Sequence, residues 1–408
     1  MADNKQNKRP NVPPLRFPEF TEQWERFKVS DMLDFYSTNS LSWEQLEFTD
    51  GELRNLHYGM IHVGLPTLLN LKESKLPTIK EGNEPKSYTL CVNGDVAFAD
   101  ASEDTNDVAK AIELVETDGQ KVVFGLHTIH GRDNKGLTEA GFKGYLFSSK
   151  VFHDQIKRIA QGTKVFSISS KNFSECFVGL PSKAEQSKIA RLLSLLDRRI
   201  TVQSKLIEDL QQLKSALVDE FYCGKSNWVA YKYKEILCPV SERNKALKIN
   251  NVLSASQEHG MISRDELDID IKFESSAIST YKIVQPGDYV LHLRSFQGGL
   301  AFSRITGICS PAYTILRPTK AVTYGFFEEF FMSKRFINSL RLVTYGIRDG
   351  RSINVDEFLN MNISIPNIDT QRKLAQILSV FRQRLNNAQT ILQKYISQKQ
   401  ILLRQMFI

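Results

Sequence analysis

The longest regular pattern in the chain is an amphipathic stretch at 182–223. Apolar residues recur there at alternating intervals of four and three, and polar Gln203 and Lys214 fill two of the expected apolar positions. This spacing is typical of the seam of a coiled coil. No proline or glycine interrupts the stretch, so the pattern predicts one helix roughly 60 Å long. The apolar seam positions are Ile189, Leu193, Leu196, Ile200, Ile207, Leu210, Leu217 and Phe221.

The same pattern recurs 185 positions later, at the C-terminal end of the sequence. The junction Leu180-Pro181 becomes Ile365-Pro366, and Lys214 matches Lys399. The corresponding seam positions are Leu374, Leu378, Phe381, Leu385, Leu392, Tyr395 and Leu402. Because neither apolar seam is stable when exposed, the two helices are expected to pack against each other as an antiparallel coiled coil. The alternative is two separate helices that cover two separate cores.

A second repeat precedes each helix, with a register that varies from 184 to 204 positions. Trp24 matches Trp228, the turn Asn93-Gly94-Asp95 matches Pro286-Gly287-Asp288, and the apolar residues after each turn predict a strand. The repeat predicts two tandem α+β domains, each followed by a spacer helix. The expected boundaries are a flexible tail at 1–14, a first domain at 15–181, a central helix at 182–225, a second domain at 226–366 and a C-terminal helix at 367–408.

The two domains differ between their matched blocks. Residues 41–67 have no recognisable counterpart in 244–270. A shared scaffold with dissimilar segments suggests one fold that recognises two different targets. A duplication whose halves have diverged without functional meaning is the alternative.

Composition and charge narrow the class of protein. A chain of 408 residues with 41% hydrophobic and 24% charged residues suits two globular domains with connectors. The formal net charge of +7 favours an anionic partner such as nucleic acid. Five cysteines without metal-type spacing are expected to be free thiols in a reducing cytoplasm. No apolar run approaches the roughly 20 residues that cross a bilayer, so a cytoplasmic protein is expected.

No catalytic motif of adequate specificity is present: the sequence lacks a phosphate-binding loop, a dinucleotide fingerprint, a nucleophile elbow and a zinc-protease motif. His127 and His130 with nearby Asp133 are the best candidate metal ligands. In an extended segment, however, residues three apart point to opposite faces, which favours a strand end or a DNA-facing loop. Asp95 and Asp288 follow glycines in turns, where they are expected to bind local backbone.

Basic residues in glycine-containing loops are the candidate DNA contacts, because guanidinium and amide groups can bind base edges and phosphates. In the second domain these are Arg294, Gln297, Tyr345, Arg348 and Arg351. In the first domain they are Lys164, Lys171, His127, His130 and Arg132. Solvated surface loops without a nucleic-acid partner are the alternative for each.

Together, the repeated helix, the lead-in at Arg16–Phe20 and the junction blocks 161–186 and 345–371 resemble the specificity subunit of type I restriction-modification systems. The resemblance covers nearly everything from Leu15 to Ile408. It implies two target-recognition domains held apart by antiparallel helices, each domain reading one half of an asymmetric, interrupted DNA site.

The same resemblance implies the partners. Such a subunit is non-catalytic and docks two DNA adenine methyltransferase subunits and, through the complex, ATP-dependent translocase-nuclease subunits. S-adenosylmethionine, ATP and Mg²⁺ are then expected in those partners, and no cofactor is expected in this chain. The rival hypotheses are a coiled-coil interaction scaffold without sequence-specific DNA binding, and a nuclease or methyltransferase that acts alone.

Overall fold

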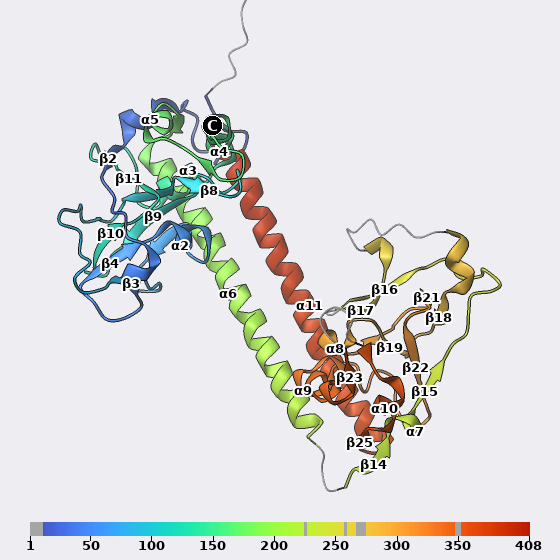
Figure 1. The fold of residues 1–408 in the computed structure, drawn as a ribbon. Helices are drawn as coiled ribbons and strands as arrows, with labels where there is room; N and C mark the ends of the chain where they lie inside the picture. The colour runs from blue at the N-terminus through green and yellow to red at the C-terminus, as the bar shows by residue number, and fades with distance from the viewer. Residues whose placement is uncertain (1–10, 224–226, 257–258, 267–274, 347–351) are drawn as a thin grey trace, which may run out of the picture. The chain divides into compact units, whose positions relative to one another are not determined.

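The computed structural model describes residues 11–223, 227–256, 259–266, 275–346 and 352–408 (Figure 1). They divide into two compact units. Unit 1 contains the chain up to Gln203 together with Ile391–Ile408, and unit 2 contains Ser204–Thr390. Each unit therefore combines one α+β domain with one end of each long helix.

Two long helices follow the two domains, α6 (Lys183–Phe221) and α11 (Ile368–Gln405). Several predicted seam positions are buried: Ile189, Leu193 and Leu196 of α6 are 1%, 0% and 5% exposed. Other seam residues are half-buried, and Ala190 and Val218, which the seam did not include, are buried as well. Leu378 and Leu385 of α11 are buried in the same way. Apolar residues outside the seam remain exposed on α6, namely Leu195, Val202, Leu206 and Leu213.

Opposite ends of the helices meet within each unit. In unit 1, Asp197 in the first half of α6 forms an ion pair with Lys399 near the end of α11, with 2.6 Å between Oδ1 and Nζ. In unit 2, Lys214 near the end of α6 and Arg382 of α11 both bind Glu329, at 2.8 and 3.0 Å. The two helices therefore pack together in the predicted antiparallel sense.

Unit 1 contains two larger sheets. One has the strand order β2-β11-β7-β9-β5 and the other β10-β4-β6-β3, in which β4 and β10 are parallel. Two-stranded pairs β1-β13 and β8-β12 complete the unit. The strands are β1 (Glu25–Lys28), β2 (Asp34–Tyr36), β3 (Leu46–Glu47), β4 (Leu53–Leu56), β5 (Leu68–Asn70), β6 (Thr78–Ile79), β7 (Val96–Ala99), β8 (Ala101–Ser102), β9 (Ala111–Glu116), β10 (Lys121–Phe124), β11 (Thr128–Arg132), β12 (Phe166–Ser167) and β13 (Phe177–Leu180).

Short helices connect these strands. They are α1 (Val29–Met32), η1 (Trp43–Gln45), α2 (Tyr58–His62), α3 (Phe142–Phe147), α4 (Lys150–Ile159) and α5 (Ser170–Ser174).

The described residues of unit 2 form a four-stranded sheet of order β15-β22-β19-β20 and four two-stranded pairs. Its strands are β14 (Val229–Lys232), β15 (Leu237–Val240), β16 (Leu253–Ser256), β17 (Gly260–Ser263), β18 (Lys282–Val284), β19 (Tyr289–Leu291), β20 (Ala301–Phe302), β21 (Gly307–Cys309), β22 (Thr314–Pro318), β23 (Thr344–Tyr345), β24 (Ser352–Ile353) and β25 (Asn362–Ile365). Its helices are α7 (Tyr233–Ile236), η2 (Arg264–Glu266), η3 (Ser275–Thr280), α8 (Ser295–Gly298), η4 (Phe330–Met332), α9 (Lys334–Ser339), η5 (Leu340–Val343) and α10 (Val355–Asn360).

The sequence repeat is also a structural repeat. In unit 1, β1 pairs antiparallel with β13, and in unit 2 the matching strands β14 and β25 pair in the same way. The helices α4 and α9 begin at equivalent serines, Ser149 and Ser333, whose hydroxyls accept hydrogen bonds from the amides of Phe152 and Phe336. The strands β7 and β19 follow the Gly-Asp turns, as predicted.

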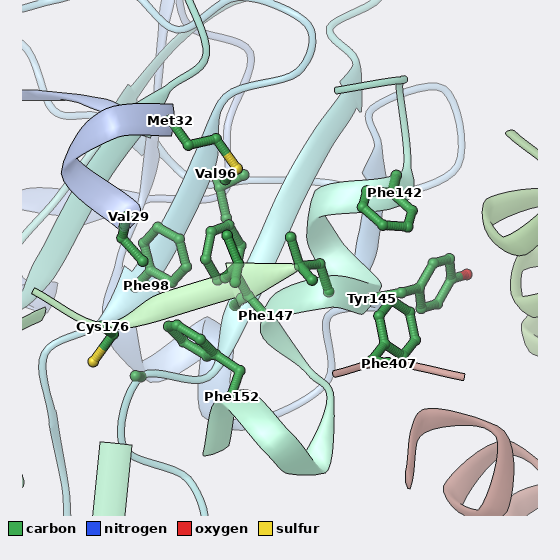
Figure 2. Packing of buried hydrophobic residues seen from close by; sticks show 14 of the residues in the cluster. Val29, Met32, Val96, Phe98, Phe142, Tyr145, Phe147, Phe152, Cys176 and Phe407 are labelled. Carbon is green, nitrogen blue, oxygen red and sulfur yellow. The ribbon is translucent and has the colours of Figure 1, made fainter. Parts of the chain in front are cut away.

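The core of unit 1 is largely aromatic and is completed by the end of the chain. Phe98, Phe147 and Phe152 pack edge to face at its centre, and Figure 2 shows the ring of Phe407 next to Tyr145 of the same core. Phe407 lies 5.9 Å from Phe142 and 6.4 Å from Trp24 between ring centroids. The residues after α11 are thus part of the first domain's core, which the sequence pattern did not predict.

One buried glutamine fixes the start of each long helix to its domain. Gln186 donates to the carbonyls of Pro181 and Leu137 at 3.0 and 3.1 Å, and accepts from the Glu139 amide at 2.9 Å. Gln371 makes the same set of bonds in unit 2, with Pro366, Ala321 and Thr323 at 2.9–3.0 Å. Both side chains are 1% exposed, so each one satisfies backbone groups that water does not reach.

The lead-in segment is anchored on the same helix start. Arg16 donates through Nε and Nη2 to both oxygens of Glu185, each at 2.7 Å. The Leu15 amide donates to the Gln405 carbonyl at 3.0 Å. No helix in the described part of the chain is both long and apolar enough to cross a membrane, and no disulfide joins the cysteines described there.

A pair of leucines on α6 tests the seam. Leu193→Ala should lower the free energy of unfolding by about 2–5 kcal/mol, because it leaves a cavity at a fully buried position. Leu195→Ala, two residues away at a position 50% exposed, should change it by less than about 0.5 kcal/mol. Chemical denaturation of both variants measures the difference, and equal losses would contradict the assignment of the seam.

Candidate nucleic-acid interface

Each domain contains a buried aspartate paired with a partly exposed arginine at the Gly-Asp turn. In unit 1, Val96 of β7 faces Gly131 of β11, and this register places Asp95 opposite Arg132. Arg132 donates through Nε to Asp95 Oδ1 at 2.7 Å and through Nη2 to Oδ2 at 2.8 Å. Burial alone would raise the pKa of Asp95, but hydrogen bonds from Arg132 and His130 outweigh it and lower that pKa.

Unit 2 repeats this pair with residues that the sequence comparison did not connect. Tyr289 of β19 faces Leu316 of β22, so Asp288 lies opposite Arg317. Arg317 donates to both oxygens of Asp288 at 2.8 and 2.9 Å. Both aspartates also accept the predicted local backbone hydrogen bond, from Val92 at 3.0 Å and from Gln285 at 2.8 Å. The Asp-Arg pair therefore belongs to the shared scaffold.

His130 lies in the buried cluster around Asp95, below the surface where it was expected. Its side chain is 1% exposed, and its Nε2 lies 2.8 Å from Asp95 Oδ2. The reason is that aromatic side chains cover its face of the sheet: the His130 ring lies 4.6 Å from Phe124 and 5.2 Å from Tyr36 between ring centroids. Arg132, also expected at the DNA-facing surface, has a side chain only 19% exposed and engaged with the same carboxylate. These two residues support the fold.

Three residues of this cluster lie close enough together to bind a metal ion, but their chemistry does not favour metal binding. Cys91, Asp95 and His130 offer ligand atoms within 4.8 Å of one another. However, the Arg132 guanidinium already occupies both oxygens of Asp95, and burial raises the pKa of Cys91 well above its usual value. A metal needs the thiolate and an accessible carboxylate, so the cluster suits a hydrogen-bonded structural role.

His127 is separated from His130 and lies at the surface, with its side chain 49% exposed. Its Nδ1 lies 3.1 Å from Asp100 Oδ1, and its ring packs against Tyr58 at 5.2 Å. Asp133, the third residue of the predicted metal grouping, instead accepts hydrogen bonds from Thr138. The structure thus does not assemble the three into one site.

In unit 2, two of the predicted DNA-contact segments meet in one groove. The groove has a volume of about 650 Å³, and Gln297 and Gly346, from segments far apart in the sequence, both line it. Its remaining lining residues are Phe296, Ile337, Arg341 and Thr344. Arg294 is exposed at the start of α8, and Tyr345 is 54% exposed with its hydroxyl bound to Glu357 at 2.7 Å. Arg348 and Arg351 lie outside the described residues.

Arg341 is a groove residue that the sequence analysis missed. It is exposed, and no hydrogen bond or ion pair engages its guanidinium among the described residues. The repeat contained a signal for it, because at the 184-position register Arg341 matches Lys157 on α4. A basic residue is thus present at the same point of both domains.

Unit 1 has a groove of about 640 Å³ that shares two repeat-matched lining positions with the unit 2 groove. Asp107 and Asp154 line it, and Asp154 pairs with Lys150 at 2.6 Å. Its basic lining residues are Lys110, Lys150, Lys157 and Arg404. His153 also lines it, at the position of Ile337, and burial together with nearby Lys157 lowers the pKa of its imidazole. Lys164 and Lys171 are exposed on the loop before β12 and on α5, and they are not among the groove's lining residues.

No protein-family model and no curated protein sequence matches the chain. Solved structures do match it. The crystal structure of a type I restriction-modification system S subunit from M. genitalium aligns with a TM-score of 0.60 over 97% of this chain and 99% of that one, at 14% identity. The chain has the fold of a type I S subunit.

A second solved structure supports the S-subunit fold. It comes from work on complex assembly and conformational transition of the type I R-M system, and it aligns with a TM-score of 0.55 over 96% of this chain and 98% of that one, at 13% identity. The fold expected from the repeats is therefore confirmed: mixed α+β, with two β-rich domains and two long helices packed together. At this identity the likeness concerns the fold, so residue roles rest on the geometry described above.

The Asp95-Arg132 pair yields a stability prediction. Asp95→Asn should reduce the free energy of unfolding by about 3–5 kcal/mol at pH 7, because Arg132 loses its buried counter-charge. The pKa of Asp95 is lowered in the folded protein, so the pair contributes stability above the unfolded pKa of about 4. The difference from wild type should therefore shrink as the pH falls below about 4.

The matched control is Asp50→Asn, at an exposed aspartate in the same domain. The free energy of unfolding of this control should stay within about 0.5 kcal/mol of the wild-type value. A variant at Asp95 that is as stable as the control at pH 7 would show that the pair is dispensable.

Proposed function

We propose that this chain is the DNA-recognition subunit of a type I restriction-modification complex. The observation that carries the proposal is the alignment of nearly the full chain, with both domains and both long helices, to a solved S subunit. A fold match to only one domain would suit many proteins. Two duplicated domains joined by an antiparallel helix pair are a more specific arrangement.

Each domain reads one half of an interrupted, asymmetric DNA site. This is supported by the shared scaffold of the two units and by the dissimilar segments 41–67 and 244–270 that they carry. Basic side chains at equivalent groove positions, Lys157 and Arg341, suit phosphate contacts that orient a domain on the duplex. A few polar side chains per domain then specify bases.

The remaining sequence-based candidates fit this assignment unequally. Arg294, Gln297 and Tyr345 lie at or beside the unit 2 groove. Arg348 and Arg351, which lie outside the described residues, stay proposed contacts. Lys164 and Lys171 are proposed phosphate contacts of the first domain. The buried positions of His130 and Arg132 remove them from the proposed interface.

The chain contributes recognition and assembly, and its partners contribute catalysis. The long helices dock two methyltransferase subunits, which bind S-adenosylmethionine, while ATP and Mg²⁺ belong to the translocase-nuclease subunits. Such a complex works on cytoplasmic DNA. The rival assignment is an interaction scaffold without sequence-specific DNA binding, and the exposed apolar residues of α6 outside the seam are the feature that favours it.

Mapping of methylated adenines separates the two assignments. The full chain, co-expressed with its methyltransferase subunit, should confer methylation at one bipartite sequence, and the purified chain alone should transfer no methyl group. Genomic DNA methylated at no defined sequence, together with normal assembly of the subunits, would favour the scaffold.

Exchange of one domain tests the hypothesis that each domain recognises its half-site independently. Replacing 226–356 with the equivalent part of a relative should change only one half of the methylated sequence, because a complete domain lies between the two long helices. The reciprocal exchange of the first domain is the control and should change only the other half. Simultaneous change of both halves by either exchange would show that the domains are coupled.

Substitution of Arg341 tests the unit 2 groove. If Arg341 grips a phosphate, Arg341→Ala should weaken binding evenly across DNA sequences and reduce the salt dependence by about one released counterion. Arg335→Ala on α9 is the matched control, since Arg335 is exposed but does not line the groove. Loss of discrimination at one base position would instead indicate that Arg341 contacts a base. Wild-type DNA binding at both low and moderate salt would show that the groove does not contact DNA.

A further inference from the structure

A group of aromatic and imidazole side chains forms a surface patch in unit 1 that the groove does not include. The patch consists of Trp43, His57, Tyr58 and His127. Trp43 lies over His57 with ring centroids 4.5 Å apart, and His57 lies 4.7 Å from Tyr58. Tyr58 then meets His127 edge to face at 5.2 Å. Three segments of the chain thus converge at one place.

The sheet explains why these segments meet. Because β4 and β10 are parallel neighbours, the residues that follow them leave the same edge of the four-stranded sheet. His57 and Tyr58 follow β4, and His127 follows β10. The Gly125 amide donates to the Leu56 carbonyl at 2.9 Å, and the Asn39 side chain donates to Asn55 at 2.7 Å. Hydrogen bonds between the segments beneath the patch therefore hold its residues in place.

His127 is held in a conformation that few residues adopt. Its φ of 55° lies in the left-handed region, which is uncommon for residues other than glycine and is found disproportionately at functional sites. Asp100 holds it from two directions: its amide donates to the His127 carbonyl at 3.0 Å, and its carboxylate lies 3.1 Å from Nδ1. The imidazole, whose side chain is 49% exposed, is thereby held at the surface.

The chemistry of the patch suits bases better than phosphates. Trp43 is 45% exposed and His57 is 2% exposed. Burial, and then the charge of His127, lowers the pKa of His57, and its Nδ1 accepts from the Gly59 amide at 3.1 Å, so this ring is neutral. Indole, phenol and imidazole groups offer apolar faces with directed donors and acceptors, which is how base edges and thymine methyl groups are recognised.

Lysines flank the patch at two sides. Lys80 donates to the carbonyl of Glu44, next to Trp43, at 2.6 Å, and Lys110 donates to the carbonyl of His62 at 3.0 Å. Two cations therefore lie close to the patch, and contacts of such groups to phosphates orient a protein on the duplex.

The position of the patch in the sequence repeat also favours a role in target recognition. Trp43, His57 and Tyr58 all lie in 41–67, the segment without a counterpart in the second domain. Residues that two related domains share support the fold, as the Asp-Arg pairs do. Residues that only one domain has are free to differ with its target.

We propose that the patch formed by Trp43, Tyr58 and His127, supported by His57, reads bases of the DNA half-site recognised by the first domain. This inference rests on the proposed function and assigns the specificity of one half-site to named side chains. A protein surface, such as that of a methyltransferase subunit, is the competing occupant.

The test uses the full chain assembled with its methyltransferase subunits. Trp43→Ala should weaken binding to the cognate duplex by about tenfold or more and relax one or more base positions in the first half of the methylated sequence, with the second half unchanged. Tyr88→Ala is the matched control. Tyr88 is 46% exposed, and it lies near Lys121 at the opposite end of β10.

Two milder variants guard against loss of folding. Tyr58→Phe removes only a hydroxyl, and His127→Asn removes the ring while keeping a residue that tolerates positive φ. Both should leave the melting temperature and subunit assembly at wild-type values and still alter the first half-site.

The outcomes are distinct. If the wild-type complex methylates no defined sequence, the proposed function itself fails. If it does methylate one and all three variants keep wild-type affinity and an unchanged first half-site, this inference is overturned alone. Loss of subunit assembly in Trp43→Ala, with the half-site intact in the milder variants, would also overturn it and would assign the patch to a protein partner.

Discussion

The fold depends on how the start of each long helix is fixed to the domain that precedes it. A helix start carries amides without helical partners, and the chain entering it must turn sharply. The helix-start amides of Glu185 and Thr370 donate to the side chains of Ser182 and Asn367. Gln186 and Gln371 then fix the entering chain, because each side chain binds two carbonyls and one amide of the adjacent domain. Because these groups are buried, removal of either amide would leave several backbone groups unsatisfied at once. The direction of each helix is thereby coupled to its own domain.

The second constraint is that opposite ends of the helices share a unit. The C-terminal residues beyond α11, with Phe407 foremost, complete the aromatic core of the first domain. The same unit contains the start of α6, anchored by Arg16 through Glu185. The first domain is thus built from both ends of the chain, and its stability depends on residues nearly four hundred positions apart.

Charge has two separate uses in this protein. Arg132 and Arg317 are held by buried aspartates in the scaffold of each domain, so these cations are not available to a partner. Lys157 and Arg341 line open grooves at matching positions. The net positive charge of the chain is therefore a poor guide to which residues bind an anion. The environment of each cation decides whether it serves the fold or the surface.

The sequence alone was sufficient to predict the long helices, their seam and the tandem domains. Heptad spacing is a local signal that repeats over many turns, and a duplication adds a second copy of every local signal. The turn aspartates were also predictable, since Gly-Asp turns bind their own backbone.

Tertiary structure decided which residues share a site. The partners of Asp95 and Asp288 lie 37 and 29 positions away and are selected by strand register, which a single sequence does not reveal. His127 and His130 are three residues apart, yet one is exposed and the other is buried, because Phe124 and Tyr36 from other strands pack on the second. Tyr58 meets His127 because the parallel strands β4 and β10 end at the same edge of the sheet. Long-range pairing is set by the packing of the whole domain, and local patterns carry no record of it.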